Sequence, residues 1–357
     1  MKKVLYIILF LQFNNGICQV ILNADGPGNT YELISSVLAP GFDAVEEPDC
    51  NHLAFGRHID EVFDTQLNTH VFRFQIHTTP DNDRCIKFDR QRNEIKTYET
   101  SPDNLKGIEG ETVVYKWKFK LDVGFQSSTK FTHIHQLKSV GGLYEDMPMY
   151  TLTTRKGTPD KLELRYAQTN VQATLKQTDL TPFKGVWVDV TETIKYGNNS
   201  GSVSGNYSII IKRVSDNSEL FSYSNNAIKN WQTNADFVRP KWGIYRSLDD
   251  VSSLRDESVL FANFSIEETP TLSLKELQQS APLITIYPNP TKTQFHIKEK
   301  VPNSFNSIKI IDNLGRIISS QKNLSYPIDI SNLNKGLYFI ELKKDTKTIS
   351  IEKLIVN

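Results

Sequence analysis

The segment TVVYKWKFKL, residues 112–121, carries apolar side chains at alternate positions with lysines between several of them. Successive side chains of a strand point to opposite faces of a sheet, so this pattern predicts a β-strand with one buried and one polar face. Similar runs, rich in Val, Ile, Tyr, Phe and Thr and broken by Gly, Asn, Asp and Pro, are HVFRFQIH (70–77), KFTHIHQLK (130–138), MYTLTTR (149–155), KLELRYA (161–167), GVWVDVTETI (185–194), YSIIIKRV (207–214) and VLFANFSIE (259–267). They predict successive antiparallel strands.

The predicted fold class is all-β: a jelly-roll β-sandwich of the concanavalin-like kind, with two stacked sheets and a polar concave face. Helical periodicity is scarce. Only DNLKG (103–107) and NNAIKNW (225–231) suggest single helical turns.

The 357 residues are enough for two domains. Residues 1–18 begin with two lysines and an apolar stretch, which indicates a secretory signal peptide cleaved before Gln19. A lipid anchor at Cys18 is the alternative. We place the sandwich at 19–268, a linker at 269–284 and a small second β-domain at 285–357.

Composition gives little indication of a partner. Lys plus Arg and Asp plus Glu are 41 each, so any anion binding must come from local clustering. We expect no nucleic-acid partner, and we expect a monomer.

In an exported chain, Cys50 and Cys85 predict a disulfide, with two buried thiols as the alternative. The cysteines lack the spacing of a zinc or redox motif, and we predict no catalytic metal.

Residues 81–83, Asp-Asn-Asp, are either a turn or ligands of a structural calcium ion.

Polar residues cluster in a few of the predicted strands. In RPKWGIYRS (239–247), Lys241, Gly243 and Tyr245 alternate, which places a cation and a phenol side by side with a gap for a ring between them. In DRQRNEIKTY (89–98), the residues that share a face are Arg90, Arg92, Glu94 and Lys96. Cations outnumber carboxylates here, which favours binding of an anion.

The run FTHIHQLKS (131–139) offers two alternatives. Strict alternation places His133 and His135 on one face and Gln136 and Lys138 on the other, so only one pair can line a cleft. The histidines lack an evident third metal ligand.

Several reaction classes lack the residues they need. No Glu-x-Asp-x-x-Glu run supplies the paired carboxylates of a jelly-roll glucanase, and no elbow motif presents a serine nucleophile. The inventory suits β-elimination on a uronate. That reaction needs donors that neutralise the substrate carboxylate, a base for C5–H and an acid for the departing O4.

The C-terminal region resembles the sorting domain of proteins exported by the type IX secretion system. The resemblance rests on YPNP (287–290), DNLGR (312–316) and ISNLNKGLYFIEL (330–342). It implies that the export machinery is a partner and that the protein reaches the cell surface or the medium.

The first domain resembles jelly-roll polysaccharide lyases. Alginate lyases of this kind carry Arg-(Ser/Thr)-Glu, Gln-Ile-His and Lys-Ala-Gly-x-Tyr strands, and this chain has RNE (92–94), QLK (136–138) and KWGIY (241–245) in that order. A literal Gln-Ile-His at 75–77 precedes the Arg-Asn-Glu strand and does not fit the order. The phrases ADGPGNTYELI (24–34), FGRHIDEVFD (55–64) and FTHIHQLKSVGG (131–142) are most similar to short ulvan lyases of marine Bacteroidetes.

The resemblance implies cleavage of ulvan, between 3-sulfated rhamnose and a uronic acid, without a certain cofactor. It implies catalytic roles for Tyr245, Lys138, Gln136, His135 and Arg92. It implies substrate-binding roles for Lys241, Arg239, Arg246, His133, Glu94 and Arg90. A lyase for glucuronan, alginate or heparin-like chains and a non-catalytic carbohydrate-binding module are the alternatives.

Overall fold

The computed structural model describes residues 19–199, 204–269, 284–299, 304–313, 315–322, 324, 326–345 and 347–357. The chain forms two compact units, Met1–Thr271 and Leu272–Asn357. The predicted signal peptide, residues 1–18, and most of the predicted linker, residues 269–284, lie outside the described residues. Within the described residues, no helix has the length and apolar character that a membrane span requires.

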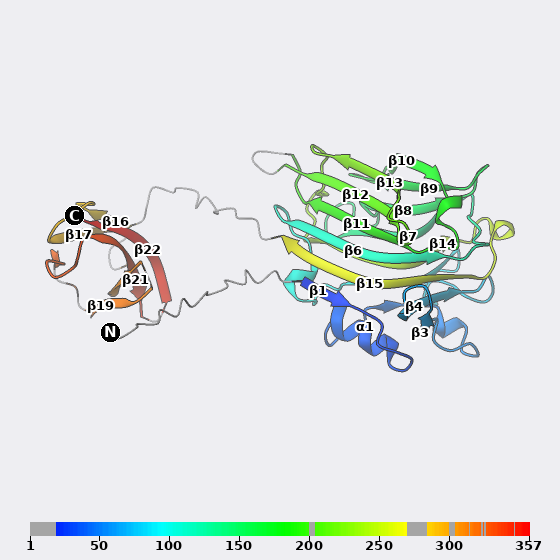
Figure 1. Ribbon diagram of the computed structural model, residues 1–357, viewed down its shortest axis with the longest axis horizontal. Coiled ribbons are helices and arrows are strands. Elements are labelled where there is room, and N and C mark those ends of the chain that lie inside the picture. The colour runs from blue at the N-terminus through cyan, green and yellow to red at the C-terminus, as the bar shows by residue number, and fades with distance from the viewer. Residues whose placement is uncertain are drawn as a thin grey trace, which may run out of the picture. The chain divides into compact units, whose positions relative to one another are not determined.

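The first unit is a sandwich of two antiparallel sheets (Figure 1). Sheet A contains, in spatial order, β13 (Glu219–Asn225), β12 (Asn206–Arg213), β11 (Val188–Lys195), β6 (Thr112–Leu121), β15 (Glu257–Thr269), β4 (Thr69–Ile76) and β3 (Ile59–Asp64), with β1 (Gln19–Leu22) also paired to β15. Sheet B contains β10 (Ala173–Asp179), β9 (Lys161–Tyr166), β8 (Tyr150–Arg155), β7 (Thr132–Val140), β14 (Phe237–Ser247), β5 (Arg90–Lys96) and β2 (Val45–Glu46). Each predicted run contains a strand, and the all-β sandwich prediction is confirmed.

The core lies between the two sheets. The alternate apolar residues of β6 are at most 1% exposed: Val113, Tyr115, Trp117, Phe119 and Leu121. Trp242 and Ile244 of β14 belong to the same core, and the rings of Trp117 and Trp242 are 6.0 Å apart. Because these residues mark the inner face of sheet B, the side chains of opposite parity on β14 and β5 form its outer face.

Short helical segments lie at the margins of the sandwich. The helix α1 (Thr30–Leu38) was not predicted. It buries Thr30, Ile34 and Leu38 along one side, and so short a helix shows too few repeats of this pattern to stand out in the sequence. The 3-10 helices are η1 (Asp49–Asn51), η2 (Asp103–Leu105), η3 (Thr181–Phe183) and η4 (Val251–Ser253). The predicted helical turn at 103–107 corresponds to η2, whereas 225–231 forms no helix, so that prediction is wrong.

The second unit is a smaller all-β structure. One sheet contains β16 (Ile284–Tyr287), β17 (Gln294–Glu299) and β20 (Ile328–Asp329), and the other contains β19 (Ile317–Lys322), β18 (Ser307–Asp312), β21 (Gly336–Lys344) and β22 (Lys347–Val356). Residues of both sheets, among them Phe295 and Ile340, share one buried core. The predicted small β-sandwich is confirmed.

The predicted disulfide is present. Cys50 and Cys85 are bonded, with their Cα atoms 6.3 Å apart. The bond joins the segment that follows β2 to the loop before β5, so it fixes two connections that flank the same edge of sheet B.

Two irregularities change which side chains share a face of sheet B. The pairing of β7 with β8 shifts register between His133 and His135. The pairing of β14 with β7 shifts between Trp242 and Tyr245, so that Tyr245 lies opposite His133 while Trp242 lies opposite His135. A β-bulge places two residues against one, so strict alternation fails at this point of β7.

Gly243 lies within the irregular part of β14. Its φ is +146°, and a Cβ atom there would lie 2.1 Å from the carbonyl oxygen of Asn93 on β5. The prediction that Gly243 leaves a gap for a substrate ring is therefore wrong. The missing side chain instead accommodates the backbone of the neighbouring strand.

We predict that Gly243→Ala lowers the free energy of unfolding by more than about 2 kcal/mol, since an unfavourable φ and a backbone clash coincide in a buried strand. Gly28→Ala is the matched control, because Gly28 has a φ of +148° but nothing within 4 Å of its Cβ position. Urea unfolding of both variants measures the difference. Equal losses in the two variants would contradict the role assigned to the clash.

Candidate functional site

The outer face of sheet B gathers the polar residues expected from the sequence. β7, β14 and β5 are neighbours, and Tyr245 lies opposite Arg92 on one side and His133 on the other. Lys241 lies opposite Lys96 and Gln136 in the same way. We call this surface the cationic face: Arg90, Arg92, Glu94, Lys96, His133, Gln136, Lys138, Arg239, Lys241 and Tyr245.

A buried carboxylate from β2, Glu46, organises the cations at the edge of this face. Its Oε1 accepts hydrogen bonds from Arg84 at 2.7 Å and Lys96 at 2.9 Å, and its Oε2 contacts Lys241 and, at 3.4 Å, Arg92. Burial alone would raise the pKa of Glu46, but the four surrounding cations hold that pKa well below its ordinary value. Glu46 was not predicted from the sequence, because it lies on a two-residue strand that is too short to show alternation.

Glu94 is the second buried carboxylate. Arg92 donates to Glu94 at 2.6 Å, Lys241 is 3.0 Å away, and Gln136 of β7 donates to it across the intervening strand β14. Although burial would raise the pKa of Glu94, Lys241 and Arg92 lower it. Glu94 is fully buried, so it is a counter-ion inside the protein and not the substrate-binding residue that we expected.

Lys138 and Arg239 lack such counter-ions. The two residues lie opposite each other on β7 and β14. Among the described residues, Lys138 forms no ion pair, and the buried Nε of Arg239 has no hydrogen-bond partner. Burial, together with the nearby charges of Lys241, Arg92 and Arg239, lowers the pKa of Lys138 to about 8. This end of the face therefore has excess positive charge.

Tyr245 lies at the other end of the cationic face. Its hydroxyl accepts a hydrogen bond from Arg90 at 2.9 Å, and the guanidinium of Arg92 lies over its ring at 3.7 Å. Burial raises the pKa of Tyr245 against the lowering effect of both arginines. The expected partner, Lys241, is instead occupied by Glu46 and Glu94, so the phenol keeps its proton at neutral pH.

The two histidines of β7 separate at the bulge. His133 joins Tyr245 on the outer face, with ring centroids 5.9 Å apart, and its Nδ1 lies 2.7 Å from the Thr153 hydroxyl. Burial lowers the pKa of His133 to about 3, so its ring is neutral. The expectation that His133 and Gln136 must lie on opposite faces is therefore wrong.

His135 lies between the sheets and is 1% exposed. Its Nε2 is 2.8 Å from Glu192 on sheet A, and its ring packs between Trp117 and Trp242. Because a substrate on the outer face cannot reach this ring, the expected catalytic role of His135 is corrected to a structural link between the sheets.

Arg246 is also directed inward. Its Nε donates to Gln91 at 2.7 Å, its Nη1 donates to the carbonyl of Arg255 at 2.8 Å, and it is 1% exposed. The predicted substrate-binding role of Arg246 is therefore wrong. Arg246 directly follows Tyr245 on β14, and adjacent side chains of a strand point to opposite faces.

The Asp81–Asp83 turn does not present three convergent ligands. Asp83 accepts hydrogen bonds from Arg84 at 2.9 Å and Arg92 at 3.0 Å, while Asn82 accepts one from the backbone of Cys85. Asp81 instead contacts histidines. The three side chains thus have separate partners, in the manner of a turn that braces Arg92.

Comparisons with known proteins concern the two units separately. Residues 285–357 match the family model described as a secretion system C-terminal sorting domain. This confirms the predicted sorting domain and indicates export to the cell surface or the extracellular space. No curated protein matches the chain.

Among solved structures, the chain is similar to an alginate lyase from Aplysia kurodai, with 14% identity and a TM-score of 0.45 over 69% of this chain and 97% of that one. It is similar to an alginate lyase from Pseudomonas aeruginosa, with 14% identity and a TM-score of 0.39 over 58% of this chain and 86% of that one. An alginate lyase from a Chlorella virus has 11% identity and a TM-score of 0.39, over 58% and 89% of the two chains.

We predict that Glu46→Gln destabilises the protein at neutral pH by about 3 kcal/mol, because removing one partner leaves buried cations uncompensated. The pKa of Glu46 is lowered on folding, so its contribution is present above pH 4.5, its ordinary value, and is lost as the pH falls further. The stability difference between variant and wild type should therefore narrow below pH 4.5.

Denaturant unfolding of the full chain across this pH range measures that difference. Glu32→Gln is the control, because Glu32 pairs with Arg57 at 2.6 Å on the exposed surface and should change stability little. A difference for Glu46→Gln that stays constant from neutral to acidic pH would contradict the account.

Proposed function

We propose that the first unit is a secreted, endo-acting polysaccharide lyase that cleaves ulvan by β-elimination between 3-sulfated rhamnose and a uronic acid. The products would carry 4,5-unsaturated uronate ends. The observation that carries the proposal is the combination, on one face, of a lysine with a pKa of about 8, a protonated tyrosine and donors for a carboxylate.

A uronate carboxylate must first be neutralised, because its charge opposes removal of the adjacent C5 proton. Arg92 and Gln136 suit this task. Both are held by Glu94, and the Nη2 of Arg92 forms no hydrogen bond with the described residues. Fixed donors need no reorganisation when the enolate-like charge develops, which makes them effective in a partly buried site.

Lys138 is the base that we favour. A base works best when its pKa is close to the operating pH, and a lysine at about 8 has a substantial neutral fraction in mildly alkaline water. Lys138 lies two residues beyond Gln136 on β7 and opposite Arg239 on β14. His133, beside Tyr245, is the rival base, but its pKa of about 3 suits a neutral donor better.

Tyr245 is the proposed acid. Its raised pKa keeps the phenol protonated through the range in which Lys138 loses its proton, so base and acid hold complementary states at the same pH. In the reaction Lys138 accepts the C5 proton, the C4–O4 bond breaks, and Tyr245 donates a proton to O4.

The preference for ulvan over an unsulfated uronate polymer rests on the sequence resemblance and on excess charge. Lys138 and Arg239 lie together without a carboxylate partner among the described residues, which suits a second anionic group such as a sulfate. A non-catalytic carbohydrate-binding module would need anion-binding cations but no group poised to titrate.

We predict an ultraviolet absorbance rise, from the unsaturated uronate, when the full chain is incubated with ulvan, and none with alginate, glucuronan or heparin assayed in parallel. Tyr245→Phe should lower the rate by about 10²–10⁴ without loss of binding, because only the acidic proton is removed. Tyr223→Phe, a half-buried tyrosine of sheet A, is the control. A rise on another polymer would discard ulvan, and binding without any rise would identify a binding module.

We predict that kcat rises with pH through about 8, because the neutral form of Lys138 is the reactive one. Lys138→Met should abolish this dependence and lower kcat by about 10²–10⁴, while His133→Asn should act mainly on KM. The reverse pattern, with His133→Asn losing kcat and Lys138→Met retaining it, would assign the base to His133.

A further inference from the structure

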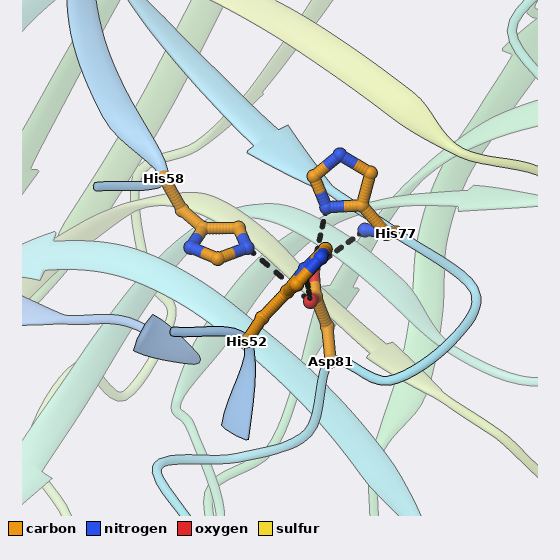
Figure 2. Close-up of side chains that lie close together, drawn as sticks. All are labelled: His52, His58, His77 and Asp81. Atoms are coloured by element: carbon orange, nitrogen blue, oxygen red, sulfur yellow. Dashed lines mark hydrogen bonds and ion pairs between the residues drawn. The ribbon is translucent and has the colours of Figure 1, made fainter. Parts of the chain in front are cut away.

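Three histidines and an aspartate from separate segments converge at one place (Figure 2). His52 follows η1, His58 precedes β3, His77 follows β4, and Asp81 lies in the loop that leads to β5. One donor atom from each residue lies within 4.8 Å of the others. The spacing of these residues in the sequence does not predict the cluster, which forms only in the tertiary structure.

The donor atoms lie at hydrogen-bond distances from one carboxylate, slightly closer than the ligands of a metal ion lie to one another. Asp81 Oδ1 is 2.8 Å from His52 Nδ1 and 3.2 Å from His58 Nε2, and Asp81 Oδ2 is 3.1 Å from His77 Nδ1. Zinc bonds to nitrogen and oxygen of about 2.0–2.2 Å place tetrahedral ligand atoms roughly 3.3–3.5 Å apart. Small side-chain rotations would therefore admit an ion between the four residues.

A second layer of contacts orients the cluster. His58 Nδ1 lies 2.6 Å from Asp49 Oδ1, and the Tyr31 hydroxyl donates to Asp49 Oδ2 at 2.9 Å. Because carboxylates only accept hydrogen bonds, Nδ1 and Nε2 of His58 both donate, to Asp49 and to Asp81, and a bound cation would take the place of the Nε2 proton. Metal-binding histidines are typically held in this way by a carboxylate on their other nitrogen.

Burial and packing favour a closed site. The side chains of His58 and Asp81 are fully buried, while those of His52 and His77 are 20% exposed, which leaves a route from solvent. The ring of Phe55 packs against all three imidazoles. The disulfide between Cys50 and Cys85 fixes the two segments that supply Asp49, His52 and Asp81.

We propose that His52, His58, His77 and Asp81 bind one zinc ion as a structural site. Three imidazole nitrogens and one carboxylate oxygen are borderline donors that suit Zn²⁺, whereas Ca²⁺ prefers six to eight oxygen ligands. Asp83 and Arg84, which directly follow in the same loop, bind Arg92 and Glu46. The ion would therefore order the loop that braces the cationic face.

The test is zinc content and affinity of the full-length protein, measured by elemental analysis after dialysis and by titration of the chelator-treated chain with Zn²⁺ alone. We expect one zinc per chain and a higher Tm with zinc. His52→Ala and His77→Ala, both at partly exposed positions, should lose the stoichiometric ion. Asp49→Asn should weaken affinity by about 10–100-fold, and His70→Ala should match wild type.

Cobalt substitution adds a readout that does not depend on stability or catalysis. Tetrahedral Co²⁺ with nitrogen ligands gives intense visible absorption, which should appear on the wild-type chain and be absent from the His52→Ala variant. A folded wild-type chain that binds Zn²⁺ no tighter than the His52→Ala and His77→Ala variants would overturn the proposal. Zinc binding that survives both substitutions would overturn it as well.

Discussion

Two buried carboxylates, Glu46 and Glu94, determine what the outer face of sheet B can do. They draw Arg92, Lys96 and Lys241 together in a partly dehydrated surface, where the cations alone would repel one another. Removing water from a charge costs several kcal/mol, so the pairs persist only because each carboxylate contacts several donors. Both carboxylates are buried and paired with these cations, so neither is available as the acid or base of a glycosidase-type reaction.

These ion pairs do not include every polar residue of the cationic face. Lys138 and Arg239 have no carboxylate partner among the described residues, and Tyr245 is surrounded by Arg90 and Arg92 instead of Lys241. Burial, together with the charges of Lys241, Arg92 and Arg239, lowers the pKa of Lys138, while burial keeps Tyr245 protonated. The proposed base and the proposed acid therefore hold complementary protonation states because of how burial and charge are divided across one face.

Sequence patterns predicted the strands, the sandwich, the disulfide and the sorting domain, because each depends on local alternation, cysteine chemistry or contiguous motifs. The site was predicted only in part. Strict alternation placed His133 and Gln136 on opposite faces, since a bulge cannot be read from residue types, and it could not identify His135 as a link to Glu192 on the other sheet. Glu46 and the histidine cluster depend on contacts between distant segments, which only the fold brings together.

The most direct test of the central claim is a crystal structure of the Tyr245→Phe variant with a bound ulvan oligosaccharide. We expect a uronate carboxylate on Arg92 and Gln136, with C5 within reach of the Lys138 amine and O4 facing the side chain at 245. We also expect a sulfate near Arg239. An oligosaccharide bound on sheet A, or on sheet B with its carboxylate away from Arg92, would contradict the assignment of this face as the site of elimination.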